Sequence, residues 1–246
     1  MAHYDLEEQE QLDALKAWWN TYGNYVSGAI LLVALSLLAW NSFSWFEYKK
    51  ANEAALLYQQ FNAAIHDKDS ARVTALAGEL IHSYPKQAYA TLAAMEAGAF
   101  SLENKDNKTA QQQLSWAAEK GEKSLKDLAK LRLAHFFLME QQWEKALDVL
   151  KNPQSMRFLP AFLDLKGDIY WAQNKTQEAL KVWKEAQTKI AADLQLQNAL
   201  ASLNEAILQK IAAIAQNETT KNEKNSESTV DFSQNVEKSS DVNQKK

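Results

Sequence analysis

This chain of 246 residues carries one uncharged stretch that decides its architecture: Tyr25-Val-Ser-Gly-Ala-Ile-Leu-Leu-Val-Ala-Leu-Ser-Leu-Leu-Ala-Trp40. No charged residue occurs between Lys16 and Glu47. A helix over residues 25–46 would be about 33 Å long, at roughly 1.5 Å per residue, which is enough to cross a hydrocarbon core of about 30 Å. Tryptophan and tyrosine residues flank the stretch on both sides, as in the two interfacial belts of a membrane span. The sequence therefore predicts a single transmembrane helix at residues 25–46.

Two other interpretations fit this stretch less well. A cleaved signal peptide begins with a basic segment, whereas residues 1–24 hold five carboxylates and one lysine. A helix buried in a soluble core seldom has so long a run without charge. We therefore expect residues 1–24 to form an uncleaved acidic segment next to the membrane.

The charges that flank the span do not fix its orientation. Lys16 precedes the span, and Lys49 and Lys50 follow it. Counted simply, this bias would place the large C-terminal part in the cytoplasm, but large domains cross membranes largely regardless of loop charge. The absence of cysteine is compatible with either side. Both orientations stay open on the residues alone.

Residues 47–216 are expected to form one all-α domain. The whole chain contains only three prolines and six glycines, so few residues interrupt a helix. Apolar residues recur at helical spacing, as in the run from Leu128 to Leu138, and no segment shows the two-residue alternation of a strand.

Inside this domain, two windows match at a spacing of 33 residues. The matching pairs are Ala134 and Gly167, Phe137 and Tyr170, Ala146 and Ala179, and Leu150 and Trp183. Small residues in the first and third pairs allow two antiparallel helices to approach closely, and a helical hairpin repeated at about 34 residues is typical of tetratricopeptide repeats. A weaker copy follows Ala97, Phe100, Ala110 and Leu114 with one extra loop residue, and a fainter one includes Ala55, Tyr58, Leu80 and Pro85. The pattern favours a tetratricopeptide-like helical solenoid over a generic helical bundle.

Residues 217–246 differ sharply in composition, being mostly Asn, Ser, Lys, Glu, Gln and Thr. Such a segment buries too little apolar surface to offset its ordering entropy, so we predict a disordered polar tail. Its charges are of both signs, unlike those of a basic nucleic-acid-binding arm.

The sequence contains none of the common patterns of catalysis or cofactor binding. Its four histidines are scattered and lack metal-ligand spacing, and glycine-rich phosphate loops are missing. With a net charge of −4 and a pI near 5.7, the chain also lacks the basic character of a nucleic-acid-binding protein. We predict a protein that is not an enzyme and uses no metal or cofactor.

Several segments together resemble the YfgM family of proteobacterial inner-membrane proteins, over roughly residues 5–215. The resemblance rests on five stretches: Leu15-Lys-Ala-Trp-Trp19, Ala55-Leu-Leu-Tyr-Gln-Gln-Phe61, Tyr89-Ala-Thr-Leu-Ala-Ala-Met-Glu-Ala97, Leu131-Arg-Leu-Ala134 and Leu163-Asp-Leu-Lys-Gly-Asp168. It implies an ancillary subunit of the Sec translocon, with a cytoplasmic N terminus and a periplasmic tetratricopeptide-like domain. The implied partners are the SecYEG channel, a PpiD-like membrane-anchored chaperone and newly exported client proteins.

Helix geometry suggests which side chains such a domain would present to a partner. One face of the helix around Ala134 carries His135 and Met139, and the same face around Gly167 carries Asp164, Asp168 and Trp171. We take these five residues as the candidate partner-binding set, with packing against neighbouring helices as the alternative.

Two other functions are compatible with the sequence. The chain could regulate a cytoplasmic stress response through its N-terminal segment, where Leu6, Leu12, Leu15 and Trp19 share one helix face. It could also be a cell-envelope scaffold that is unrelated to secretion.

Overall fold

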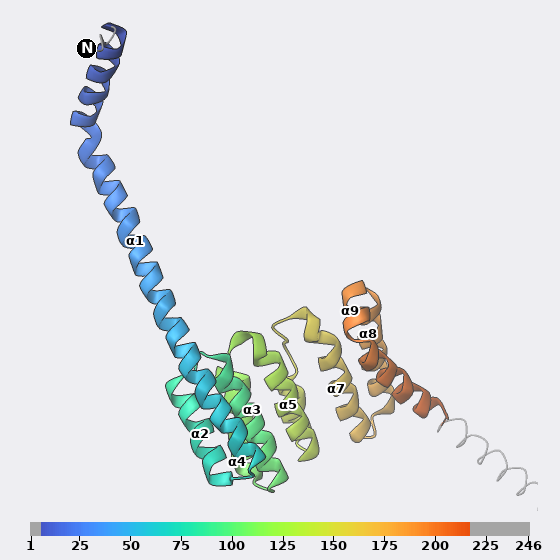
Figure 1. The fold of residues 1–246 in the computed structure, drawn as a ribbon. Coiled ribbons are helices and arrows are strands. Elements are labelled where there is room, and N and C mark those ends of the chain that lie inside the picture. The colour runs from blue at the N-terminus through green and yellow to red at the C-terminus, as the bar shows by residue number, and fades with distance from the viewer. Residues whose placement is uncertain (1–5, 217–246) are drawn as a thin grey trace, which may run out of the picture.

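The computed structural model describes residues 6–216, apart from the side chains of residues 6–9, 39 and 42–44, and this part of the chain is helical without strands (Figure 1). The all-α prediction is therefore confirmed. The predicted polar tail at 217–246 lies outside the described residues, as do residues 1–5 of the acidic segment.

A single helix, α1 (Leu6–His66), contains the end of the acidic segment, the predicted span and the first helix of the solenoid. No proline occurs in it, so nothing in the covalent chain interrupts the helix at residue 24 or 46. Within α1, Glu10–Leu38 is long and apolar enough to cross a membrane: an 18-residue part of it has a mean hydropathy of 1.5, and only 6% of that part is buried. The prediction of one N-terminal membrane helix is confirmed at this level, and the borders at 25 and 46 stay a prediction.

The remaining helices form antiparallel hairpins that stack side by side (Figure 1). The end of α1 pairs with the first helix after it, and each later pair packs on the one before. The helices that follow are α2 (Ser70–Ser83), α3 (Ala88–Glu103), α4 (Asn107–Lys120), α5 (Lys126–Met139), α6 (Trp143–Val149), α7 (Leu159–Ala172), α8 (Thr176–Ala191) and α9 (Leu194–Ala199), with short 3-10 turns η1 (Lys123–Leu125) and η2 (Met156–Phe158) and a last helical segment at 201–216. This stack is the predicted tetratricopeptide-like solenoid.

The same turn joins the two helices of every hairpin. Lys68, Lys105, Gln141 and Asn174 each have a positive φ, between 55° and 62°. After each of them, the next backbone N–H donates to a carbonyl five residues earlier, as Asp69 does to Ala64 at 3.0 Å. This is the Schellman arrangement, which closes the end of a helix. Its four occurrences establish four hairpins in the described part of the chain.

Aligning the hairpins on these turns corrects one predicted copy. The residue equivalent to Ala134 and Gly167 is Gly98 rather than Ala97, and no extra loop residue is needed. A Cβ added to Gly98 would lie 2.8 Å from Leu114 Cγ, and one added to Gly167 would lie 2.5 Å from Trp183 Cδ1. Gly98 and Gly167 are therefore required because a large residue of the second helix, Leu114 or Trp183, packs directly against each of them.

The first hairpin reverses these sizes. The equivalent positions hold Phe61 in α1 and Ala77 in α2, both fully buried in the same apolar cluster. Because close-packed cores conserve total volume, a large residue on one helix can be balanced by a small one on its partner. This exchange explains why the first copy was so faint in the sequence.

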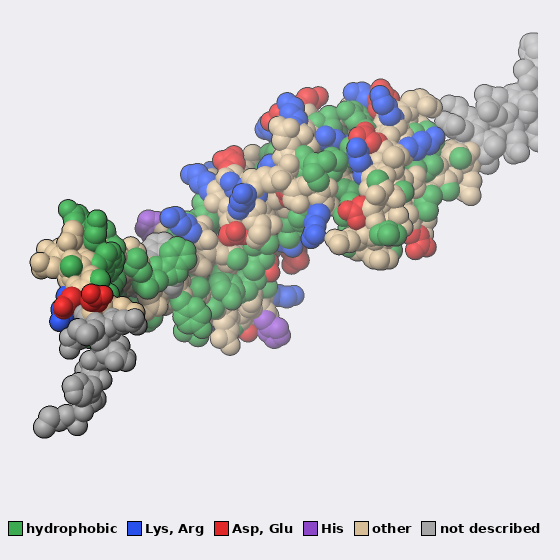
Figure 2. All heavy atoms as spheres, turned by 90° about the horizontal axis from the view of Figure 1, so that it is seen from above, with side chains coloured by type: hydrophobic (Ala, Val, Ile, Leu, Met, Phe, Trp, Pro, Cys, Tyr) green, Lys and Arg blue, Asp and Glu red, His purple; other side chains and the backbone are tan. Residues whose placement is uncertain are grey.

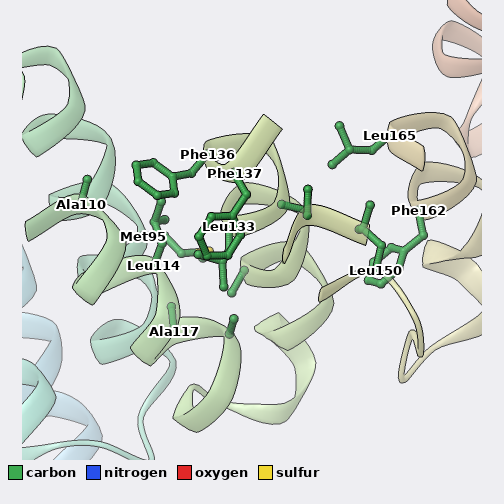
Figure 3. Close-up of a cluster of buried hydrophobic side chains, with 14 of the residues drawn as sticks. Met95, Ala110, Leu114, Ala117, Leu133, Phe136, Phe137, Leu150, Phe162 and Leu165 are labelled. Carbon is green, nitrogen blue, oxygen red and sulfur yellow. The ribbon is translucent and has the colours of Figure 1, made fainter. Parts of the chain in front are cut away.

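The core runs through the stack and contains the predicted repeat residues. Ala134, Ala146 and Leu150 are fully buried in the central cluster of Figure 3. Ala179 and Trp183 are buried in the last cluster, against Ile207 of the segment 201–216. That segment therefore closes the exposed end of the solenoid.

Polar contacts hold the C-terminal part of α1 on its neighbours. The Tyr58 hydroxyl donates to Glu96 Oε1 at 2.9 Å, and the Tyr84 hydroxyl donates to Glu53 Oε2 at 3.2 Å. Partial burial and the hydrogen bond to Glu96 raise the pKa of Tyr58 to about 12. The apolar segment is thus continuous with the C-terminal part of α1, which packs onto the solenoid.

Candidate functional site: a groove across the first helices of the hairpins

A groove crosses one face of the solenoid, where α3, α5 and α7 lie next to one another. Its volume is about 590 Å³. The lining is mainly apolar, with Met95 and Leu102 from α3, Leu131 from α5 and Leu165 from α7. Because each of these helices is the first of its hairpin, the same side of the last three hairpins contributes to the groove.

Four of the five predicted site residues line this groove. His135 and Met139 come from α5, and Asp164 and Asp168 come from α7. Each pair is separated by four residues, which places both side chains on one helix face. Met139 is 61% exposed, a high value for a large apolar side chain. Trp171, which lies further along α7, does not line the groove, although the residue is 43% exposed.

The two aspartates are engaged by a residue that sequence reasoning missed. Lys210, in the segment 201–216, donates to Asp164 Oδ1 at 2.8 Å and to Asp168 Oδ1 at 2.6 Å. Its ammonium group also lies 5.6 Å from the centre of the Trp183 ring. No local pattern marks Lys210, because its partners lie more than forty residues earlier in the chain. The aspartates therefore anchor the last helix as well as line the groove.

Burial and charge act in opposite directions on this cluster. Desolvation raises the pKa of Asp168, although the hydrogen bond from Lys210 opposes this shift. Burial alone would lower the pKa of Lys210, but hydrogen bonds and charge interactions with Asp164 and Asp168 raise it overall. Lys210 is therefore held in its charged form, and it neutralises part of the negative charge of Asp164 and Asp168.

The resulting site has an apolar floor, a methionine at its surface and a polar wall. Methionine adapts its shape to different apolar partners, so this surface suits apolar segments of polypeptide more than one rigid small molecule. Among the described residues, no three His, Asp or Glu side chains lie close enough together to hold a metal ion. The apolar floor and the exposed Met139 side chain give the groove the chemistry of a surface that binds apolar polypeptide.

Comparison with known proteins places this architecture in a family. A family model described as a tetratricopeptide repeat-like domain matches residues 16–216. A protein of Neisseria gonorrhoeae is 30% identical over 190 residues, which cover 76% of this chain and 91% of the relative. A protein of Aggregatibacter actinomycetemcomitans is 29% identical over 192 residues, covering 77% and 93%. One from Escherichia coli K12 is 25% identical over 178 residues, covering 72% and 85%.

All three relatives carry the name ancillary SecYEG translocon subunit, which describes a non-catalytic kind of protein. The family model's match at residues 16–216 includes both the predicted span and the solenoid, and each relative is matched over most of its length. The chain therefore belongs to the YfgM family of tetratricopeptide repeat-like proteins.

Proposed function

We propose that this protein is an ancillary subunit of the Sec translocon, anchored in the inner membrane by one helix, whose groove binds apolar segments of partner proteins. The observation that carries the proposal is the groove itself. It presents Met139 and an apolar floor on a solenoid that α1 ties to the membrane. The names of the curated relatives support the translocon as the place of action.

The partners that we propose are the SecYEG channel, a PpiD-like membrane-anchored chaperone and exported proteins. Attachment to the same membrane converts a second encounter into an intramolecular one and raises the effective concentration to about millimolar. A shallow groove with modest intrinsic affinity then suffices to hold a chain that emerges beside it. The mechanism is retention of apolar segments without covalent chemistry.

We further propose that the N terminus is cytoplasmic and that the solenoid is periplasmic, the side on which exported chains emerge. A topology reporter fused after Gln216 tests this directly. Activity of a periplasm-dependent reporter, such as alkaline phosphatase, is expected. Activity of a cytoplasm-dependent reporter in its place would refute this orientation and the binding of exported chains.

Site-specific photocrosslinking in whole cells tests the binding surface. A photoreactive amino acid at Met139, inside the groove, is expected to crosslink to the channel, the chaperone or an exported protein. The matched control is Gln112, an exposed residue of α4 that does not line the groove. Equal crosslinking from Met139 and Gln112 would refute the groove as the partner-binding site.

A further inference from the structure

One edge of the solenoid lies at the end nearest the membrane helix. Because the helices alternate in direction, the connections between successive hairpins all fall on this side (Figure 1). We call residues 83–88, 120–126, 150–158 and 192–194 the proximal edge. Gln87, in the first of these connections, contacts α1 directly: its side chain donates to Glu47 Oε2 at 3.4 Å. Glu47 directly follows the predicted span.

The proximal edge carries cations that are available for a ligand. Lys86, Lys123 and Arg157, one from each of its first three connections, are exposed and form no ion pair with any described residue. At the base of the span, Lys50 lies 4.5 Å from the centre of the Phe46 ring. Figure 2, which looks onto this side of the molecule, shows Lys and Arg side chains spread along the solenoid, with hydrophobic, Asp and Glu side chains between them.

The carboxylates of the same edge are directed at backbone donors. Glu122 accepts from the N–H of Ser124 at 2.9 Å, and Asp193 accepts from the N–H of Gln195 at 2.8 Å. Asp127, directly after the second of these connections, is buried and accepts from the N–H groups of two residues in the connection between α6 and α7, at 2.8 and 2.9 Å. These acidic groups hold the connections in shape, and the exposed cations give the edge its outward charge.

Two apolar side chains project from the same edge. Met156 is 68% exposed and Leu194 is 76% exposed. Outside α1, they are the two most exposed of the large hydrophobic residues in the described part of the chain. Met156 is followed directly by Arg157. An apolar side chain beside exposed cations is the arrangement by which peripheral proteins contact a lipid surface.

We propose that the proximal edge rests on the surface of the bilayer that holds α1, with Met156 and Leu194 in the headgroup region and Lys86, Lys123 and Arg157 contacting the phosphates of anionic phospholipids. The solenoid would then run along the membrane, and its groove would be held at a fixed height above the lipid. This contact does not depend on which leaflet the solenoid faces.

Attachment through α1 makes weak lipid contacts effective. A cation near an anionic membrane surface contributes about 1 kcal/mol, which corresponds to about a fivefold change in an equilibrium constant. The span already restricts the edge to the vicinity of the surface, so three cations and two apolar side chains suffice to hold it there. The contact weakens as salt shortens the screening length from about 10 Å at 0.1 M to about 3 Å at 1 M.

Fluorescence quenching of the full chain in vesicles tests the proposal. The chain contains no cysteine, so Met156→Cys and Leu194→Cys can each be labelled with a single fluorophore. The control is Lys108→Cys, an exposed position next to the opposite turn between α3 and α4. The vesicles contain a headgroup nitroxide lipid in phosphatidylcholine, with or without one third phosphatidylglycerol.

Probes at the two edge positions are expected to be quenched more strongly than the probe at Lys108, and more strongly with phosphatidylglycerol than without it. Reversal of two edge charges, Lys123→Glu with Arg157→Glu, should lower the ratio of bound to free edge at least about 25-fold, because each lost cation contributes about fivefold. Reversal of Lys108 and Lys175 on the opposite side should leave it unchanged. Equal quenching at all three probes, or quenching that ignores phosphatidylglycerol, would overturn the proposal.

Discussion

Replacing Gly167 with alanine should destabilise the solenoid, although alanine normally favours a helix. Gly167 lies in the middle of α7, against the Trp183 ring of α8. An added Cβ would lie 2.5 Å from Cδ1 and 2.6 Å from Cε2 of that ring, whereas ordinary contacts begin near 3.4 Å. Trp183 is only 1% exposed, so its ring has little room to withdraw.

The magnitude follows from three opposing contributions. Overpacking of a core costs about 1–3 kcal/mol. A shifted indole also loses the hydrogen bond from Trp183 Nε1 to the carbonyl of Asp164, at 3.1 Å, which contributes about 1 kcal/mol. Alanine has a higher helix propensity than glycine, which stabilises the folded state by about 1 kcal/mol. The net loss is about 1–3 kcal/mol, which lowers the Tm by about 2–12 °C for a domain of this size.

Thermal unfolding followed by far-UV circular dichroism, on the full chain in detergent micelles, measures this effect. The matched control is Gly78→Ala in α2, where an added Cβ would meet nothing within 4 Å. That variant should be more stable than the parent by up to about 1 kcal/mol. Combining Gly167→Ala with Trp183→Phe should cost less than the sum of the single changes, because the smaller ring relieves the overlap. A Gly167→Ala protein that melts at or above the parent temperature would refute the argument.

The features that could be predicted from the sequence are those that depend on residues close together in the chain. The uncharged run before Glu47 indicated the span, and four-residue spacing placed His135 beside Met139 and Asp164 beside Asp168 on one surface. Helix periodicity is a property of neighbouring residues, so it can be read without knowledge of the partner helix. Trp171 shares the predicted helix face but does not line the groove, because an exposed position on a helix does not by itself place a side chain in a groove.

Features that depend on pairs of distant residues could not be predicted. Lys210 is recognisable as a partner of Asp164 only once the segment 201–216 has folded back on α7. The first repeat was faint because Phe61 and Ala77 exchange the sizes that the later repeats use. The turns could not be predicted either. Lys68 and Lys105 have a positive φ, a conformation that is typical of glycine and is not expected of lysine.

Three further substitutions test individual contacts. Asp127→Ala removes the two charge-assisted hydrogen bonds that this buried carboxylate accepts from the N–H groups of Gln154 and Ser155, and should cost about 2–4 kcal/mol in urea unfolding, whereas Asp127→Asn should cost less because it retains one oxygen. Lys210→Met should lower the Tm most at neutral pH; the deficit should shrink as pH rises through the raised pKa of Lys210, above which the parent loses the same charge, and a deficit independent of pH would contradict the ion pairs. Tyr58→Phe should change the response to alkaline pH. Because the Tyr58 pKa is about 12 in the fold against an ordinary 10.0, the unfolded chain ionises first, and the parent should lose stability as pH rises from 10 to 12. The phenylalanine variant lacks this ionisation, so its Tm should fall less steeply over the same range, and parallel curves for the two proteins would show that Tyr58 is not held neutral by burial and by its contact with Glu96.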